Sequence, residues 1–184
     1  MKTGFIVLAL ILGLLLGVGR MSPAKPLRWT CTVIIEFFRA VPVLIMMIFA
    51  YFLFALYDVF PSKQLALAGV VTGLTLYNGA VLAEVFRAGI NAVPKGQSEA
   101  AYAIGMRKGQ VMNIILLPQA VKIMIPAIIS QCVVTLKDTS LGAVIAAPGL
   151  TATAPRIYGE FNNQVPIYIV IAALYIAVNL VLTY

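Results

Sequence analysis

The chain has 184 residues, of which 62% are hydrophobic and 10% are charged, and its formal net charge is +7. Soluble domains carry about 25% charged residues, so this composition excludes an ordinary soluble enzyme or binding domain and indicates a polytopic helical membrane protein. The basic residues punctuate apolar runs, which favours a role in membrane orientation over binding of nucleic acid. We therefore expect an all-α fold, a single transmembrane domain over residues 1–184, a lipid bilayer around it and no nucleic-acid partner.

Five segments are predicted to span the membrane, since each is apolar over much of the roughly 20 residues that cross a bilayer. They are residues 4–19, 41–57, 65–85, 123–136 and 165–184. The short first span and the abrupt end of the last one leave open whether the natural chain continues beyond either end. Within the first span, Gly13 and Gly17 form a small-xxx-small pattern, which we interpret as close packing inside the bundle.

The segments between the spans are expected to be mostly irregular. Residues 20–28 are predicted to form a basic loop, and residues 155–164 a polar loop. Residues 141–150 are apolar but too short to cross, which indicates a re-entrant or interfacial piece. The loops after the first and third spans carry more basic residues than the others. The positive-inside rule then places the N-terminus outside and the loop over residues 91–118 in the cytoplasm.

The loop over residues 91–118 is polar and prone to form helices. Pro94 and Gly96 are expected to end the preceding helix, Ser98 to cap a new short helix, and Glu99 to lie in its first turn. Alanines follow, and a helix of small side chains can approach a partner's groove closely. On the residues alone, this part of the loop is either a solvated amphipathic segment or a docking site for another protein.

The second half of the loop is expected to turn and form another short helix. Gly105 can end the first helix or permit a sharp bend, and Pro118 is expected to break the second. The whole segment is predicted to lie across the cytoplasmic face.

Seven positions of this loop resemble the EAA signature of ABC importer permeases, which reads E-A-A, three residues, G, nine residues, I-x-L-P. The matching residues are Glu99, Ala100, Ala101, Gly105, Ile115, Leu117 and Pro118. In that family the loop forms a coupling helix held by the ATPase subunit. The resemblance implies that the ATPase-coupling residues are Glu99, Ala100, Ala101, Gly105, Arg107, Leu117 and Pro118.

Flanking stretches narrow the resemblance to the polar amino-acid subfamily, and they are residues 36–42, 77–90, 93–97 and 136–141. The resemblance implies a type I permease of about five core helices in a bacterial plasma (inner) membrane. It also implies several partners: ABC ATPase subunits that bind ATP and Mg, a second permease subunit (identical or homologous), and an extracytoplasmic solute-binding protein. The substrate would be an amino acid, and Lys137 beside the expected pathway favours an acidic one such as glutamate.

Two kinds of polar residue lie within or beside the spans. Tyr77, Asn78 and Gln131 are expected at mid-span depth, facing a cavity, although for Asn78 a bond to a neighbouring helix is the favoured interpretation. At the outer end of the fourth span, Lys137, Asp138 and Ser140 offer opposite charges and a hydroxyl to a zwitterion, or they satisfy a helix end. The substrate-pathway candidates are Tyr77, Asn78, Gln131, Lys137, Asp138 and Ser140.

Charged residues towards the cytoplasmic ends of two spans are spaced for local ion pairs. Glu36 and Arg39, like Glu84 and Arg87, are three residues apart, which suits an i,i+3 pair on a helix. An unpaired charge inside a membrane is costly, so we interpret these four as gating or structural contacts.

Two alternatives remain open on the residues alone. A secondary carrier or channel would need intramembrane carboxylates for ion coupling, and only Glu36 and Glu84 qualify. An intramembrane enzyme would have to work without histidine, which excludes Ser-His and zinc mechanisms and leaves a serine-lysine dyad or a carboxylate pair. Cys31 and Cys132 show no metal-ligand spacing. The chain has no P-loop motif, so we expect no catalytic residue, cofactor or metal of its own.

Overall fold

The computed structural model describes residues 4–183, and that range contains helices and turns but no strand. The first half consists of α1 (Gly4–Arg20), α2 (Lys25–Ala40), α3 (Val43–Leu56) and α4 (Ser62–Asn91). The second half consists of α5 (Lys95–Ala103), α6 (Lys108–Gln110), the π-helix η1 (Val111–Leu116), α7 (Leu117–Asp138), the 3-10 helix η2 (Thr139–Ile145), α8 (Leu150–Phe161) and α9 (Gln164–Thr183). The predicted all-α class is confirmed.

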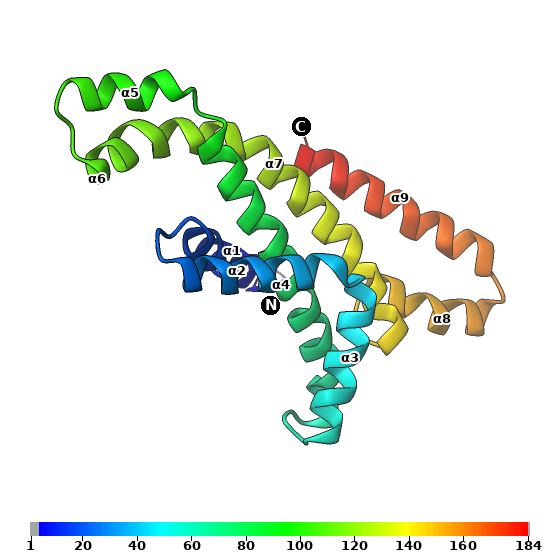
Figure 1. The fold of residues 1–184 in the computed structure, drawn as a ribbon. Coiled ribbons are helices and arrows are strands. Elements are labelled where there is room, and N and C mark those ends of the chain that lie inside the picture. The colour runs from blue at the N-terminus through cyan, green and yellow to red at the C-terminus, as the bar shows by residue number, and fades with distance from the viewer. Residues whose placement is uncertain (1–3, 184) are drawn as a thin grey trace.

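Helix α4 forms the centre of the fold, and α1, α2, α3, α7 and η2 all pack against it (Figure 1). Its 30 residues make it about 45 Å long, which exceeds the roughly 30 Å of hydrocarbon in a bilayer. We call one end of the molecule the α3 end, where residues 57–61 join α3 to α4. The opposite end is the α5 end, where α5 and α6 project from the bundle (Figure 1).

Small residues allow α1 and α4 to approach closely. A Cβ added at Gly13 would lie 2.8 Å from the Cβ of Leu82 and 3.0 Å from the carbonyl oxygen of Gly79. A Cβ at Gly17 would lie 3.2 Å from the carbonyl oxygen of Ala83. Neither glycine has room for a larger side chain, so the small-xxx-small pattern serves packing within the bundle, as predicted.

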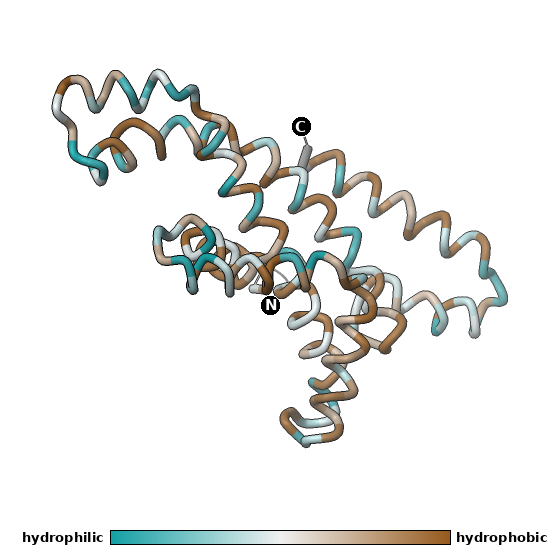
Figure 2. Tube along the Cα trace, viewed as in Figure 1, coloured by the Kyte–Doolittle hydropathy of each residue, from teal (hydrophilic) through white to brown (hydrophobic). Residues whose placement is uncertain are grey.

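Five apolar elements account for the predicted spans. Among the described residues, three helical segments are long and apolar enough to cross a membrane: residues 62–91, 108–145 and 164–181. The pair α2 and α3 makes a fourth candidate with a bend of 101°, and α1 is a shorter apolar helix of 17 residues. Figure 2 shows long hydrophobic stretches on α3 and α9, whereas hydrophilic segments gather around α5 and α6.

The prediction of a basic loop over residues 20–28 is wrong in its second part, because α2 begins at Lys25. Cys31 and Ile35, four residues apart, are buried against α1 and α4. The apolar stripe that these two residues form is short, and charged residues interrupt it. The longer apolar run from residue 41 was therefore the stronger signal in the sequence.

The second predicted span, residues 41–57, corresponds to α3. The chain bends just before it, between α2 and α3, where Val41 and Pro42 leave the helical conformation. Proline disfavours helical conformation in the residue before it and has no N–H to continue the helix. The apolar helix that follows is therefore only 14 residues long.

The fourth predicted span is part of a longer segment, and Pro118 does not break it. Helical structure runs from residue 108 to residue 145, with Pro118 as the second residue of α7. The turn before it is a π-helix, in which the N–H of Leu117 bonds to the carbonyl of Met112. This wider turn relieves the clash that proline normally makes with the preceding turn.

Two outer segments are more ordered than the sequence suggests. The predicted polar loop over residues 155–164 is wrong, since α8 includes Pro155 and ends at Phe161, followed by Asn162 with a φ of 49°. Residues 141–150 begin inside η2, which continues α7. Its Leu141 and Ile145 pack on a core cluster from α1, α3 and α4. The last predicted span corresponds to α9, and its final residue, Tyr184, lies outside the described residues.

Candidate functional site

The helix that carries the E-A-A residues begins earlier than predicted. Helix α5 starts at Lys95 directly after Pro94, whose extended backbone makes the turn into the helix. Ser98 is therefore not a cap, and its hydroxyl donates to the carbonyl of Lys95 at 2.8 Å. Glu99 is the fifth residue of α5 and lies beyond the first turn. Both predictions about the start of this helix are wrong.

The end of α5 is a turn that requires glycine. Gly105 has φ +83°, a left-handed conformation that costs other residues about 1–2 kcal/mol. The N–H of Gly105 donates to Tyr102 and that of Met106 donates to Ala101, at 3.0 and 3.1 Å. This bond pair is the Schellman motif, which satisfies the last carbonyls of a helix. The predicted sharp turn at Gly105 is confirmed.

After the turn, the chain returns towards the bundle as a continuous helix. The N–H of Arg107 donates to the side-chain oxygen of Gln110 at 2.8 Å, which caps α6. The side chain of Gln119 on α7 donates to Gln97 on α5 at 3.2 Å. We call the unit formed by α5, α6 and η1 the α5 hairpin; it is held at its turn and at its base.

The α5 hairpin presents a distinct outer surface. Ala101 and Val111 are buried between its two limbs. Glu99, Ala100 and Arg107 are exposed, and Ile104 is 79% exposed. Small side chains beside an exposed isoleucine suit insertion into a groove of another protein. Leu117 is half-buried and Pro118 exposed at the base of the hairpin.

A polar network joins α4 to α7 inside the bundle. Asn78 is 1% exposed, and its side-chain oxygen accepts from Gln131 at 2.7 Å and from Thr135 at 2.6 Å. Its amide donates to the carbonyl of Leu74 at 2.8 Å. The adjoining cavity measures only about 10 Å³, which is room for about one water molecule. The interhelical bond anticipated for Asn78 is present; Thr135 was missed because a lone threonine gives no spacing signal.

The other pathway candidates do not join this network. Tyr77 is half-buried on α4 and forms no hydrogen bond within the described chain. Lys137 is exposed at the end of α7, beside half-buried Asp138. No ion pair links them to each other or to another described residue. Ser140 is half-buried in η2. The structure thus brings Asn78 and Gln131 together and leaves these four side chains separate.

A second cluster lies near the α5 end, where the two predicted ion pairs form. Arg87 bonds to Glu84 at 2.9 and 3.1 Å, and Arg39 lies 3.6 Å from Glu36. Arg20 at the end of α1 connects the pairs, with its guanidinium 2.5 Å from Glu84 and 3.2 Å from Glu36. Sequence reasoning missed this role, since Arg20 was assigned only to a basic loop.

Comparison with known proteins gives many matches, and they agree with one another. The glutamate transport system permease protein GluD of Corynebacterium glutamicum is 51% identical over 178 residues, covering 97% of this chain and 65% of GluD. The probable glutamine ABC transporter permease protein GlnP of Bacillus subtilis is 36% identical, covering 95% and 80%. The crystal structure of an amino acid ABC transporter with histidines matches with a TM-score of 0.91 at 30% identity, covering 97% and 82%.

The helical bundle and the α5 hairpin, together with these matches, define an inner-membrane transport protein. The profile of the family described as "Binding-protein-dependent transport system inner membrane component" matches residues 9–184. The chain belongs to this family. The resemblance to ABC importer permeases drawn from the motifs is thereby confirmed. The chain spans just under two thirds of the length of GluD, and about four fifths of GlnP.

Proposed function

We propose that this chain is the transmembrane subunit of an ATP-driven ABC importer for polar amino acids delivered by a solute-binding protein. The observation that carries this proposal is the α5 hairpin. It projects beyond the bundle, its turn depends on Gly105, and its outer surface holds the exposed Glu99 and Ala100 of the signature. A solvated loop would not need a fixed turn or an exposed isoleucine.

The α5 hairpin is suited to pass movement from a partner into the bundle. Helix α5 follows α4 after three residues, and η1 continues directly into α7. A rigid push on the hairpin would therefore act on both helices at once. We propose that ABC ATPase subunits bind ATP and Mg, grip the hairpin, and shift the bundle between two states.

We also propose an orientation and further partners. The α5 hairpin lies in the cytoplasm and the α3 end faces outward, so the N-terminus is outside, in keeping with the positive-inside rule. A second permease subunit, identical or homologous, covers the exposed apolar faces that lipid does not. The chain itself holds no cofactor, and nucleotide belongs to the ATPase partner.

The substrate proposed is a polar amino acid, with glutamate preferred. The 51% identity to GluD supports glutamate. The exposed ammonium of Lys137 is also suited to a carboxylate. The candidate pathway residues are Tyr77, Gln131, Lys137, Asp138 and Ser140, with Asn78 holding Gln131 in place.

The test is ATPase activity of the whole complex in liposomes. The chain is co-expressed with its ATPase and binding protein, and the complex is challenged with binding protein loaded with glutamate, glutamine, aspartate or arginine. We expect stimulation by loaded binding protein only, strongest with glutamate. Stimulation by another amino acid alone would contradict the substrate but not the transport class.

The alternative mechanism predicts a different result in the same liposomes. A secondary carrier would take up labelled glutamate without ATP. Uptake that persists without ATPase subunits, or failure of any ATPase to associate with the chain, would overturn the proposal.

A further inference from the structure

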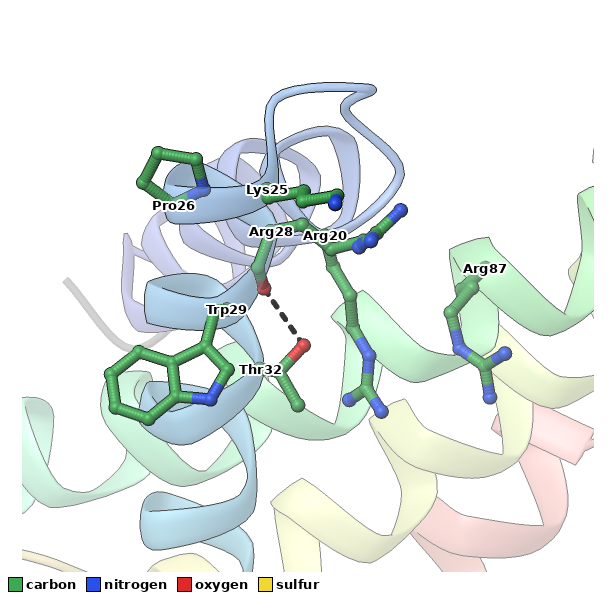
Figure 3. A pocket seen from close by; sticks show the side chains of 7 residues that line it. All are labelled: Arg20, Lys25, Pro26, Arg28, Trp29, Thr32 and Arg87. Atoms are coloured by element: carbon green, nitrogen blue, oxygen red, sulfur yellow. Dashed lines mark hydrogen bonds between the residues drawn. The ribbon is translucent and has the colours of Figure 1, made fainter.

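A basic pocket lies at the α5 end, between the start of α2, the end of α1 and the last turns of α4. It measures about 660 Å³ and is lined by Arg20, Lys25, Pro26, Arg28, Trp29, Thr32 and Arg87 (Figure 3). Four of these seven residues are cations and none is an acid. The pocket is separate from the α5 hairpin and from the Asn78 network, and transport does not explain it.

The pocket has more positive charge than its acidic neighbours neutralise. The guanidinium of Arg20 is paired with Glu36 and Glu84, and Arg87 is paired with Glu84. Lys25 and Arg28 form no ion pair with any residue that the structure describes. The unpaired cations come from one turn of α2 and flank the same opening. They are suited to a phosphate group, which carries negative charge and several acceptor oxygens.

Beside the cations, α2 carries an apolar stripe that no part of the described chain covers. Trp29 is 72% exposed, and Val33 and Phe37 follow at intervals of four residues with 47% and 61% exposure. The opposite face of α2, with Cys31 and Ile35, packs on the bundle. A helix with one apolar outer stripe and basic residues at its start is typical of helices lying in a membrane interface.

The position of the pocket along the membrane-spanning helices agrees with a place at the membrane interface. The pocket includes Arg20, the last residue of α1, and Arg87, which lies four residues before the end of α4. Because α2 meets α3 at 101°, it does not simply extend the line of α3. Indole rings such as that of Trp29 prefer the headgroup level of a bilayer.

We propose that this pocket binds the phosphate of an anionic phospholipid, with the acyl chains lying along the stripe of Trp29, Val33 and Phe37. The charge excess selects an anionic headgroup over a zwitterionic one. The adjoining apolar stripe selects a lipid over a free phosphate ion, which would make no use of it. The inference rests on the membrane location of the family and not on the amino-acid substrate.

Trp29 is the single tryptophan of the chain, and it supplies the probe. The complete complex is placed in nanodiscs that contain brominated phosphatidylglycerol or brominated phosphatidylcholine at equal fractions. The emission that is lost in a Trp29→Phe complex isolates the signal of Trp29. At the same fraction, we expect brominated phosphatidylglycerol to quench this signal clearly more than brominated phosphatidylcholine does.

Charge-neutral variants identify the cations responsible. In a Lys25→Gln/Arg28→Gln complex we expect the preference for phosphatidylglycerol to fall about tenfold or more, since each cation near an anionic surface strengthens its attraction appreciably. A Lys63→Gln/Arg156→Gln complex is the matched control. It removes two exposed cations elsewhere and should keep the preference. Size-exclusion chromatography verifies that each complex is intact.

Three results would overturn the proposal. Equal quenching by the two lipids in the unmodified complex would show that the pocket has no anionic preference. An unchanged preference in the Lys25→Gln/Arg28→Gln complex would assign the selectivity elsewhere. Loss of the preference on addition of millimolar inorganic phosphate would indicate a site for soluble anions. None of these measurements depends on which amino acid the transporter carries.

Discussion

Asn78 uses both acceptor positions of its side-chain oxygen inside the protein. Gln131 and Thr135 on α7 both donate to it, and its amide returns a bond to its own helix. An amide in an apolar bundle needs such partners, because burial without them is costly. A passing substrate could bond to the side-chain oxygen of Asn78 only by displacing one of them. Asn78 is therefore primarily a link between α4 and α7, and Gln131 is the better candidate for direct contact.

This link predicts the effect of Asn78→Leu, which keeps the size of the side chain but removes its polar atoms. The amide of Gln131 loses its bond to Asn78, and Thr135 keeps only its bond to the carbonyl of Gln131. We expect the complex to lose about 1–2 kcal/mol of stability, measured as a lower unfolding temperature in detergent. Tyr77→Phe is the matched control, since the neighbouring hydroxyl has no partner among the described residues. Unchanged stability with lost transport would instead assign Asn78 to the substrate.

Helix α5 illustrates which features of an element its sequence determines. Gly105 and the E-A-A residues predicted a helix followed by a turn, and the turn is present with φ +83°. The predictions for Ser98 and Pro118 were wrong, because α5 begins three residues before Ser98 and because proline is tolerated in the first turn of a helix, where Pro118 lies. Here Pro94 makes the turn into the helix and a π-helical turn accommodates Pro118, and neither feature has a strong sequence signal.

The turn predicts a graded series of substitutions at Gly105. Gly105→Leu must adopt a left-handed conformation that disfavours side chains by about 1–2 kcal/mol, so the hairpin would reshape and hold the ATPase less well. Gly105→Asn should be milder, because asparagine tolerates this region better than most residues. The measurement is the amount of ATPase that co-purifies with the chain.

A control in the same hairpin separates bulk from backbone strain. Gly109→Leu adds the same side chain at a position where a Cβ meets nothing within 4 Å and φ is not positive. It should retain more ATPase than Gly105→Leu. If both leucine variants bind the ATPase equally well, the left-handed turn is not what the partner requires.

At the scale of the whole molecule, the neighbouring helices pack around α4, whereas the outer helices keep apolar side chains exposed. Val181 and Ile169 on α9 are 80% and 63% exposed, so lipid or another subunit must cover them. The membrane-spanning helices were predictable from apolar runs, whereas α2 and α8 were not. Their assembly was not, because it depends on pairs far apart in the sequence, such as Gly13 with Leu82 and Arg20 with Glu84. A single sequence carries no signal for such pairs.

Arg20 is the residue whose loss should test that assembly, because it joins α1, α2 and α4 at the α5 end. The side chains of Arg20 and Glu84 are only 16% and 17% exposed, so water screens their attraction less than at an open surface. We expect Arg20→Gln and Glu84→Gln each to destabilise the complex. The double variant should lose less than the sum, which gives a coupling of about 1–3 kcal/mol in a double-mutant cycle.

The more exposed ion pair of Glu36 and Arg39 is the control against which the coupling energy of Arg20 and Glu84 is compared. Its side chains are 54% and 40% exposed and its atoms lie 3.6 Å apart, so the same cycle should give about 1 kcal/mol or less. Because Glu36 also contacts Arg20, the control cycle is measured with Arg20 unchanged. A larger coupling for Arg20 with Glu84 than for Glu36 with Arg39 would show that Arg20 holds α1, α2 and α4 together. Additive effects of Arg20→Gln and Glu84→Gln would instead mean that packing of the glycine-lined α1–α4 contact holds this end together without the charges.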